Sequence, residues 1–219
     1  PMAASPAHGV IYAGVNGEVW VIGARSSRVL ARIPAALLTD GFAVDDRDNV
    51  LGVLGEETLT MIDGRTHQAL APVDVTNGTE DAGAQAEGFD PQTRTFYADV
   101  ECDPASWVTA VSEQTGKVVA TISTQGALRT LAVDTSRNVV FAVDYVSGDV
   151  LVINARTNKV ITTLGVGTHP GAVAVNPVTG RAYVANSSRT LSVLGPASAS
   201  ARPTDGAGRA AGPQRGFCG

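Results

Sequence analysis

Short apolar runs alternate with polar turn residues along most of the chain. Residues 171–195 give the clearest example, in which GAVAVN, RAYVAN and TLSVLG follow one another and PVTG separates the first two. Runs of this length, rich in Val, Ala, Thr and Tyr and bounded by Gly, Asn and Pro, predict β-strands joined by tight turns. The preceding copy adds a fourth run, because DVLVIN (149–154) is joined through ARTN to KVITTL (159–164). The pattern therefore predicts a four-stranded antiparallel meander.

This meander recurs five times. The residues that open its first turn are spaced by 40, 45, 44 and 42 positions, and they are Ser5, Asp45, Asp90, Asp134 and Asn176. A drifting period in the low forties is typical of propeller blades, because loop lengths vary while strand lengths do not. A β-sandwich would not require one turn phrase at matching strand positions five times. We therefore expect an all-β propeller over residues 1–195, with repeats near 3–36, 37–79, 80–123, 124–164 and 165–195.

A specific family resemblance accompanies the repeat. Residues 152–195 resemble the YVTN family β-propeller repeat, and YVAN at 183–186 stands where the family's name motif sits. The likeness extends over roughly residues 3–195 and is strongest in the last two copies. The family includes YncE-like proteins and is related to lactonase-like and cytochrome d1-type propellers. The resemblance implies the fold more firmly than an activity, and it implies an exported bacterial protein, extracellular or periplasmic.

The predicted ring is incomplete. No strand-like run precedes Ser5 where the first innermost strand is expected, and no outer strand follows Leu194. We therefore expect three complete blades between two partial ones. Because a propeller protects its edges by closing, three explanations arise: a fragment of a longer propeller, which we favour, self-association that completes the ring, or a divergent small propeller. Residues 196–219, rich in Ala, Gly, Pro, Arg and Ser, predict a disordered tail.

Composition narrows the classes of partner. The formal charge of −5 is spread along the chain without basic clusters, which argues against nucleic acid. No apolar stretch approaches the roughly 20 residues of a membrane span. The two cysteines, Cys102 and Cys218, form no C-x-x-C motif, so neither a zinc ribbon nor attached haem is indicated. Two thiols are favoured over a disulfide between them, and no cofactor is predicted.

Candidate binding residues gather in the loops of one face. Loops that join consecutive blades share a face with the loops between second and third strands, and superposing the repeats aligns Asp99, Asp144 and Asn186 at the end of the second strand. The ten candidates are Glu80, Asp81, Glu87, Asp99, Glu101, Arg129, Asp144, Tyr145, His169 and Asn186. One hypothesis is an acidic rim that binds a cation or a polar small molecule. The favoured alternative is that Asp and Asn at strand ends accept turn amides.

No catalytic or metal-ligand constellation is evident. His169 is the only histidine expected on this face and has no second histidine or cysteine at ligand spacing. Ser187 and Ser188 lack a G-x-S-x-G motif, and a haem-bearing redox propeller lacks a histidine ligand set. We therefore expect a non-catalytic binding or scaffold propeller for a protein, peptide or surface polymer. Trp107 and Tyr145 lie in or beside the face loops and are candidate anchors for such a partner, although packing at the blade edges is the favoured alternative for both. The alternative, a lactonase-like hydrolase or its remnant, is motivated by the related fold and by His169 and Arg129 beside the rim.

Overall fold

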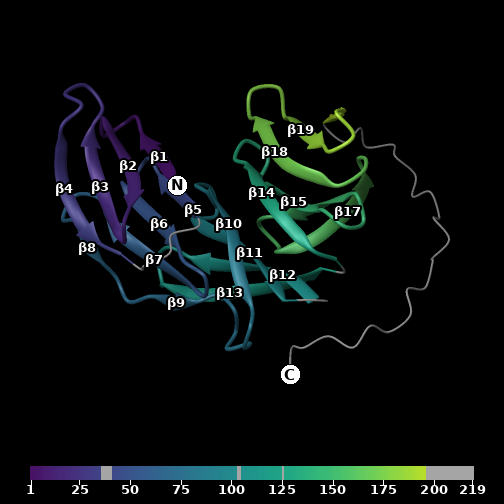
Figure 1. The fold of residues 1–219 in the computed structure, drawn as a ribbon, viewed down its shortest axis with the longest axis horizontal. Helices are drawn as coiled ribbons and strands as arrows, with labels where there is room; N and C mark the ends of the chain where they lie inside the picture. The colour runs from purple at the N-terminus through teal and green to yellow at the C-terminus, as the bar shows by residue number, and fades with distance from the viewer. Residues whose placement is uncertain (36–40, 103–104, 125, 196–219) are drawn as a thin grey trace.

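The computed structural model describes residues 1–35, 41–102, 105–124 and 126–195, which fold into antiparallel sheets (Figure 1). These residues form twenty strands. They contain no helix that is long and apolar enough to cross a membrane. The predicted all-β class of four-stranded sheets is confirmed. The expected tail at 196–219 and Cys218 lie outside the described residues.

The strands pair in chain order within each of five sheets, which we call blades 1 to 5. Blade 1 contains β1 (Met2–Ser5), β2 (Val10–Val15), β3 (Glu18–Gly23) and β4 (Val29–Pro34). Blade 2 contains β5 (Gly41–Asp45), β6 (Val50–Leu54), β7 (Thr58–Asp63) and β8 (Gln68–Ala69), and β9 (Val73–Asp74) also pairs with β7. Blade 3 contains β10 (Gly83–Asp90), β11 (Thr95–Cys102), β12 (Ala105–Ser112) and β13 (Lys117–Thr124). Blade 4 contains β14 (Leu128–Asp134), β15 (Val139–Asp144), β16 (Asp149–Asn154) and β17 (Lys159–Gly165), and blade 5 contains β18 (Pro170–Asn176), β19 (Arg181–Asn186) and β20 (Leu191–Leu194).

Blade 1 is more complete than its sequence indicates. Met2–Ser5 forms the innermost strand, in register with β2 from Met2 opposite Ala13 to Ser5 opposite Val10. The prediction that the first repeat lacks this strand, and with it the count of three complete blades, is wrong. MAAS contains no β-branched residue, and it becomes a strand because β2 offers an edge and Ala3 packs on the core. Four blades have four strands or more, and the described part of blade 5 has three.

The blades are arranged as an open arc. Their inner strands contact one another in the order β1, β5, β10, β14 and β18, and no comparable contact within the described ranges joins β18 back to β1. Figure 1 shows blade 1 (purple) and blade 5 (yellow-green) at the two ends of this arc. Each pair of consecutive blades buries one apolar cluster; between blades 4 and 5, for example, Val143 and Val150 pack with Val184. The core is thus divided into four seams, each made by facing sheets.

The recurring turn phrase has a common hydrogen-bond pattern. The side chains of Asp45, Asp90 and Asp134 are buried, and each accepts a hydrogen bond from the backbone N–H two residues later. Asn176 does the same with the N–H of Val178, at 3.0 Å. Four residues after each turn-opening residue φ is positive, at Gly9, Asn49, Arg94, Asn138 and Gly180. The phrase therefore recurs because Asp or Asn stabilises the turn and a later residue adopts a left-handed backbone.

The same turns bond each blade to its neighbour. The Ser5 hydroxyl donates to Asp46 at 2.7 Å, and the Arg94 guanidinium pairs with Asp48 at 2.6 Å. In the next seam the Gln92 amide donates to the carbonyl of Thr135 at 2.6 Å. Arg137 donates to the carbonyl of Gly180 in blade 5 at 2.7 Å. This turn face is therefore occupied by structural contacts between consecutive blades.

Candidate functional site

The three residues aligned at the end of the second strand hold loops in place. Asp144 accepts the N–H groups of Val146 and Ser147 at 2.9 and 3.0 Å. The Asn186 amide donates to Thr190 Oγ1 at 3.1 Å and to Ser192 Oγ at 3.0 Å. These side chains are buried and satisfy polar groups of their own blades. They shape the loop face without presenting oxygen ligands on it.

Asp99 is buried at the same repeat position in blade 3. One carboxylate oxygen accepts the N–H of Ala86, and the other has no hydrogen-bond partner in the described structure. Burial raises the pKa of Asp99 to about 6, while the backbone N–H groups of Ala86 and Gln85 lower it and the nearby Glu101 raises it. The Glu101 carboxylate in turn accepts a hydrogen bond from the Gln85 amide.

Glu87 lies inside the molecule rather than on its rim. Its side chain packs in the seam between blades 2 and 3, where a Cβ atom on Gly52 would lie 3.3 Å from Oε2. Both carboxylate oxygens are enclosed and lack a hydrogen-bond partner in the described residues, although part of the stem is accessible. Burial raises the pKa of Glu87 to about 8, and the backbone of Ala43 opposes this rise. Glu80 and Asp81 are exposed, so the ten candidates do not form a single acidic rim.

Three of the candidates come together on the loop face of blades 4 and 5. The guanidinium carbon of Arg129 lies 5.7 Å from the centre of the Tyr145 ring. The rings of Tyr145 and His169 are 4.8 Å apart between centroids and tilted by 40°. Arg129 belongs to β14, Tyr145 follows β15 and His169 precedes β18. We call Arg129, Tyr145 and His169, with the 70% exposed Val146 beside them, the aromatic cluster.

Backbone contacts hold the loops of this cluster. The N–H of Tyr145 donates to the carbonyl of Ala127 at 2.9 Å. The backbone N–H of Ser187 reaches the carbonyl of Thr168 at 3.1 Å, and the Ser187 hydroxyl reaches the same carbonyl at 3.0 Å. His169 has a positive φ of 46°, and its ring lies beside that of Tyr145. The cluster is thus a preformed feature held by two blades.

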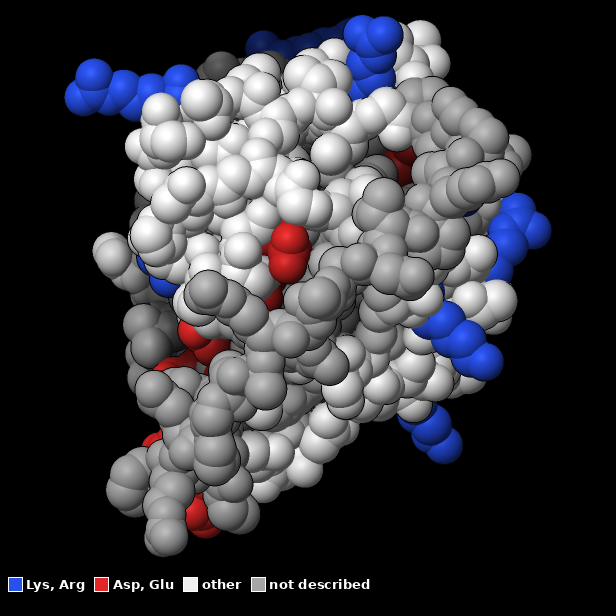
Figure 2. Space-filling view, turned by 90° about the vertical axis from the view of Figure 1, so that its right-hand side faces the viewer, with Lys and Arg blue, Asp and Glu red and all other residues white. Residues whose placement is uncertain are grey.

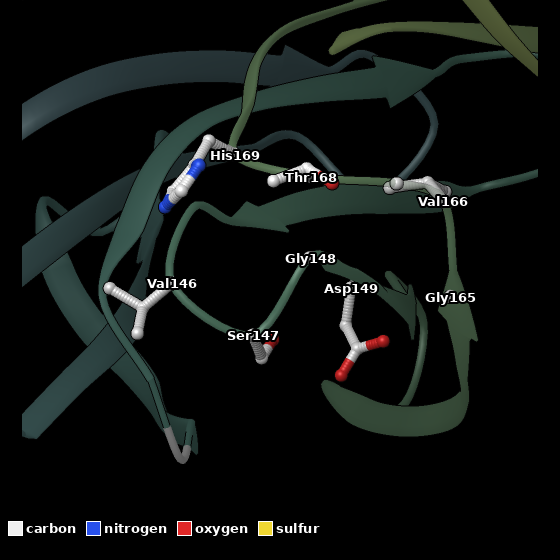
Figure 3. Close-up of a pocket in the computed structure, with 9 residues that line it drawn as sticks. Val146, Ser147, Gly148, Asp149, Gly165, Val166, Thr168 and His169 are labelled. Carbon is white, nitrogen blue, oxygen red and sulfur yellow. The ribbon is translucent and has the colours of Figure 1, made fainter. Parts of the chain in front are cut away.

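A hollow of about 460 Å³ adjoins the aromatic cluster (Figure 3). It is lined by residues 146–149 and 165–169, and Figure 3 shows His169 and Asp149 on opposite sides of it. The carbonyl of Gly148 accepts the N–H of Val166 at 2.9 Å, which ties its two walls together. A Cβ atom at Gly148, where φ is 78°, would lie 2.4 Å from the carbonyl oxygen of Gly167, so this approach requires glycine. The hollow offers the Asp149 carboxylate and the His169 imidazole to a polar ligand, while Tyr145 and Arg129 lie next to His169 outside its lining.

The side of the molecule seen in Figure 2 carries both signs of charge. Lys and Arg side chains stand around its margin, and Asp and Glu side chains lie near its centre and toward the lower left, among described residues that are mostly uncharged (Figure 2).

One acidic cluster on the turn face could be mistaken for a metal site. Asp45, Asp48 and Glu113 place one oxygen each within 4.8 Å of one another. The Arg94 guanidinium lies among them, 2.6 Å from Asp48 and 2.9 Å from Glu113. Burial raises the pKa of Glu113, and the hydrogen bond from Arg94 lowers it. Because Arg94 bonds Asp48 and Glu113, and Asp45 accepts the backbone N–H of Arg47, the cluster is a salt-bridge network that joins blades 2 and 3.

Comparison with known proteins identifies the fold alone. No protein-family model matches the chain, and no curated protein matches it. Among solved structures, Kuenenia stuttgartiensis Hydrazine Synthase superposes with a TM-score of 0.72 at 15% identity, over 84% of this chain and 54% of that one. The Cps50 (Swd1) β-propeller domain of Myceliophteria thermophila superposes with a TM-score of 0.73 at 12% identity, over 93% of this chain and 67% of that one. The fold is that of a β-propeller. The chain spans only about half of the hydrazine synthase chain, and identities this low carry no activity across.

Proposed function

We propose that this protein is a non-catalytic propeller that binds a protein, peptide or surface polymer through the loop face of blades 4 and 5. The observation that carries the proposal is the aromatic cluster beside the hollow. Tyr and Arg are the residue types that most often anchor interfaces, and here Tyr145 remains 38% exposed although Arg129 and His169 flank it.

The chemistry of the cluster favours a ligand with carboxylates. His169 lines the hollow and Arg129 lies near the Tyr145 ring; both offer N–H donors, and the ring offers a flat apolar surface beside them. A guanidinium binds carboxylates with directed hydrogen bonds, and an aromatic face stacks on rings or sugar faces. We therefore propose an acidic peptide or an acidic surface polysaccharide as the ligand class. The Lys and Arg residues are spread along the sequence without basic clusters, which disfavours nucleic acid.

We also propose membership of the YVTN family, with export to the periplasm or the exterior of a bacterial cell. Support comes from the YVAN motif at 183–186 and from the repeat that surrounds it. An exposed polymer-binding face is useful to an exported protein. Mass spectrometry of fractionated cells that express the native gene would test the location, and recovery from the cytoplasm alone would overturn it.

Binding to an array of acidic peptides and uronic-acid polysaccharides tests the proposed function. Tyr145→Ala and Arg129→Ala should each weaken the strongest interaction at least tenfold, a magnitude typical of an interface anchor. Arg32→Ala is the matched control, because it removes a guanidinium that lies 4.5 Å from the Trp20 ring in blade 1. Unchanged affinity in the two loop-face variants would contradict the proposal. Hydrolysis of sugar lactones, assayed on the same samples, would instead favour the lactonase-like alternative if Asp149→Asn or His169→Ala abolished it.

A further inference from the structure

The third residue of the second strand faces the seam with the next blade; it is Tyr12, Tyr97 and Phe141 in blades 1, 3 and 4, and Gly52 in blade 2. Tyr12 is fully buried there, and its hydroxyl donates to Asn49 of blade 2 at 2.7 Å. Tyr97 is also fully buried, and its hydroxyl lies 3.0 Å from the carbonyl of Ala155 and 2.9 Å from Asn158 Oδ1 in blade 4. In blades 1 and 3 this residue is therefore an anchor that one blade inserts into the following one.

Tyr183 is the same anchor in blade 5, without a following blade in the described structure. It is the third residue of β19 and lies opposite Ala174 and Val193. Its ring is only partly buried, and no hydrogen bond of its hydroxyl is present within the described residues. Strand alternation places it on the face away from blade 4, because its neighbours Ala182 and Val184 pack against blade 4.

The surroundings of Tyr183 complete an apolar face. Leu191 and Val193 of β20 are 60% and 51% exposed and stand on the same side as Tyr183. Ala172 and Ala174 of β18 add small side chains beside them. We call this surface the trailing face. Blades 1 and 3 would present a similar face, with a tyrosine hydroxyl left without its hydrogen-bond partner, if the next blade were removed.

Blade 1 carries the complementary surface, which we call the leading face. Ile11 stands at the repeat position of Leu51, Phe96 and Val140, each of which is fully buried against the preceding blade. Blade 1 has no preceding blade in the described structure, and the leading face consists of Met2, Ile11, Trp20, Ile22 and Val29. Met2 and Val29 are 76% and 42% exposed.

The turn beside the leading face also contains hydrogen-bond acceptors that are equivalent to those that bind the tyrosine hydroxyl in an inner seam. In blade 4 that receptor is the turn after β16, where the N–H of Ala155 donates to the carbonyl of Asn138. In blade 1 the N–H of Ala24 donates to the carbonyl of Gly9 in the same way, and Ser27 has the positive φ of Asn158. The Ala24 carbonyl and the Ser27 hydroxyl could thus accept a hydrogen bond from the tyrosine of a blade docked against the leading face.

From these two faces we propose that the chain self-associates head to tail, with the trailing face of one copy docked on the leading face of a second copy. We choose a second copy as the partner because the chain carries both surfaces of a blade-to-blade seam, one at each end. It already forms four such seams internally. The two halves differ, so the contact is heterologous rather than two-fold. The Tyr183 hydroxyl then donates to the Ala24 carbonyl or to Ser27 of the second copy. The proposal is independent of the loop-face function.

Sedimentation of the full chain over a hundredfold range of concentration provides the test. The mean mass should rise from that of a monomer, and Tyr183→Arg on the trailing face or Ile11→Arg on the leading face should each hold it at the monomer. A mixture of these two variants should form one-to-one dimers, because each retains one intact face. Val178→Arg is the control, since Val178 is 93% exposed in the turn of blade 5 and lies off the face. All samples should show the wild-type circular dichroism spectrum and thermal transition.

A milder substitution tests the proposal even if one of the introduced arginines unfolds the blade that carries it. Tyr183→Phe removes only the hydroxyl and should weaken association about fivefold, as expected for one hydrogen bond. A wild-type chain that stays monomeric throughout would overturn the proposal and leave the end faces to other blades or partners. Dimers that survive Ile11→Arg but not Tyr183→Arg would also overturn it, in favour of a symmetric pairing of trailing faces.

Discussion

At the scale of single residues, Glu87 is the clearest departure from the repeat. The equivalent position, three residues before the turn-opening residue, holds Met2, Phe42, Leu131 and Val173 in the other blades. Its neighbour Gly52 stands where the other second strands have Tyr or Phe, and the Phe96 ring occupies the space, since a Cβ on Gly52 would lie 2.7 Å from it. The Phe96 ring of blade 3 thus fills the space left by the missing aromatic side chain at Gly52. The buried carboxylate of Glu87 has no such compensating partner in the described structure.

This placement makes the stability of the fold depend on pH. The folded state holds the proton of Glu87 up to a pKa of about 8, from the ordinary value of 4.5. Below the pKa of Glu87 in the unfolded chain, the protonated side chain contributes its full stabilisation to the fold. This contribution is lost as the pH rises through the pKa of Glu87 in the folded state, by roughly 3–5 kcal/mol in all. Denaturant unfolding should therefore show a lower free energy of unfolding at pH 8.5 than at pH 5.

Two substitutions isolate this effect. Glu87→Gln should remove most of the pH dependence and leave a smaller part from Asp99, whose pKa is also raised, to about 6. Glu87→Met, which restores the residue type of the other blades, should raise the stability at pH 8.5. Glu80→Gln changes an exposed carboxyl near the same blade and should alter neither value. An unchanged pH profile in Glu87→Gln would show that the carboxyl is hydrated.

At the scale of elements, the seam between blades 2 and 3 depends on Arg94. This residue follows the turn after β10, and its guanidinium bonds both Asp48 of blade 2 and the nearly enclosed Glu113 of its own blade. Arg94→Ala should cost about 2–4 kcal/mol of stability, because Glu113 then remains buried without its cation. Arg47→Ala is the matched control, since Arg47 also approaches Asp48 but is largely exposed at 4.0 Å. It should cost less than about 0.5 kcal/mol, and equal losses in a denaturant titration would argue against the network.

The elements also show how far sequence reasoning reaches. The turns could be predicted from the sequence because their geometry depends on nearby residues alone: an Asp or Asn accepts a turn N–H, and a later residue such as Asn138 adopts a positive φ. The innermost strand of blade 1 was missed because Met2–Ser5 becomes a strand only through its partner β2. Aligning the five repeats position by position would have identified Glu87 as a core replacement. The contact of Arg129 with Tyr145 could not be predicted, since a strand and a distant loop meet only when the blade is folded.

At the scale of the whole molecule, an open arc makes stability depend on nearest neighbours. Within the described residues, blades 2, 3 and 4 are covered on both faces, whereas blades 1 and 5 are covered on one. In such arrays each repeat is stabilised by its own hydrogen bonds and by the adjoining seams. The three described strands of blade 5 should therefore open more often than those of blade 3.

Hydrogen exchange followed by mass spectrometry measures this difference directly. At concentrations where the chain is monomeric, amides of β11 and β15 should exchange at least tenfold more slowly than those of β19, because their sheets are enclosed on both sides. Raising the concentration should then slow β19 and β2 while leaving β11 unchanged, since docking of the end faces covers the outer blades only. Tyr183→Arg should abolish that concentration dependence without changing β11. Equal exchange in all five blades of the monomer would mean that the arc unfolds as a single cooperative unit, and that its end blades need no partner for their stability.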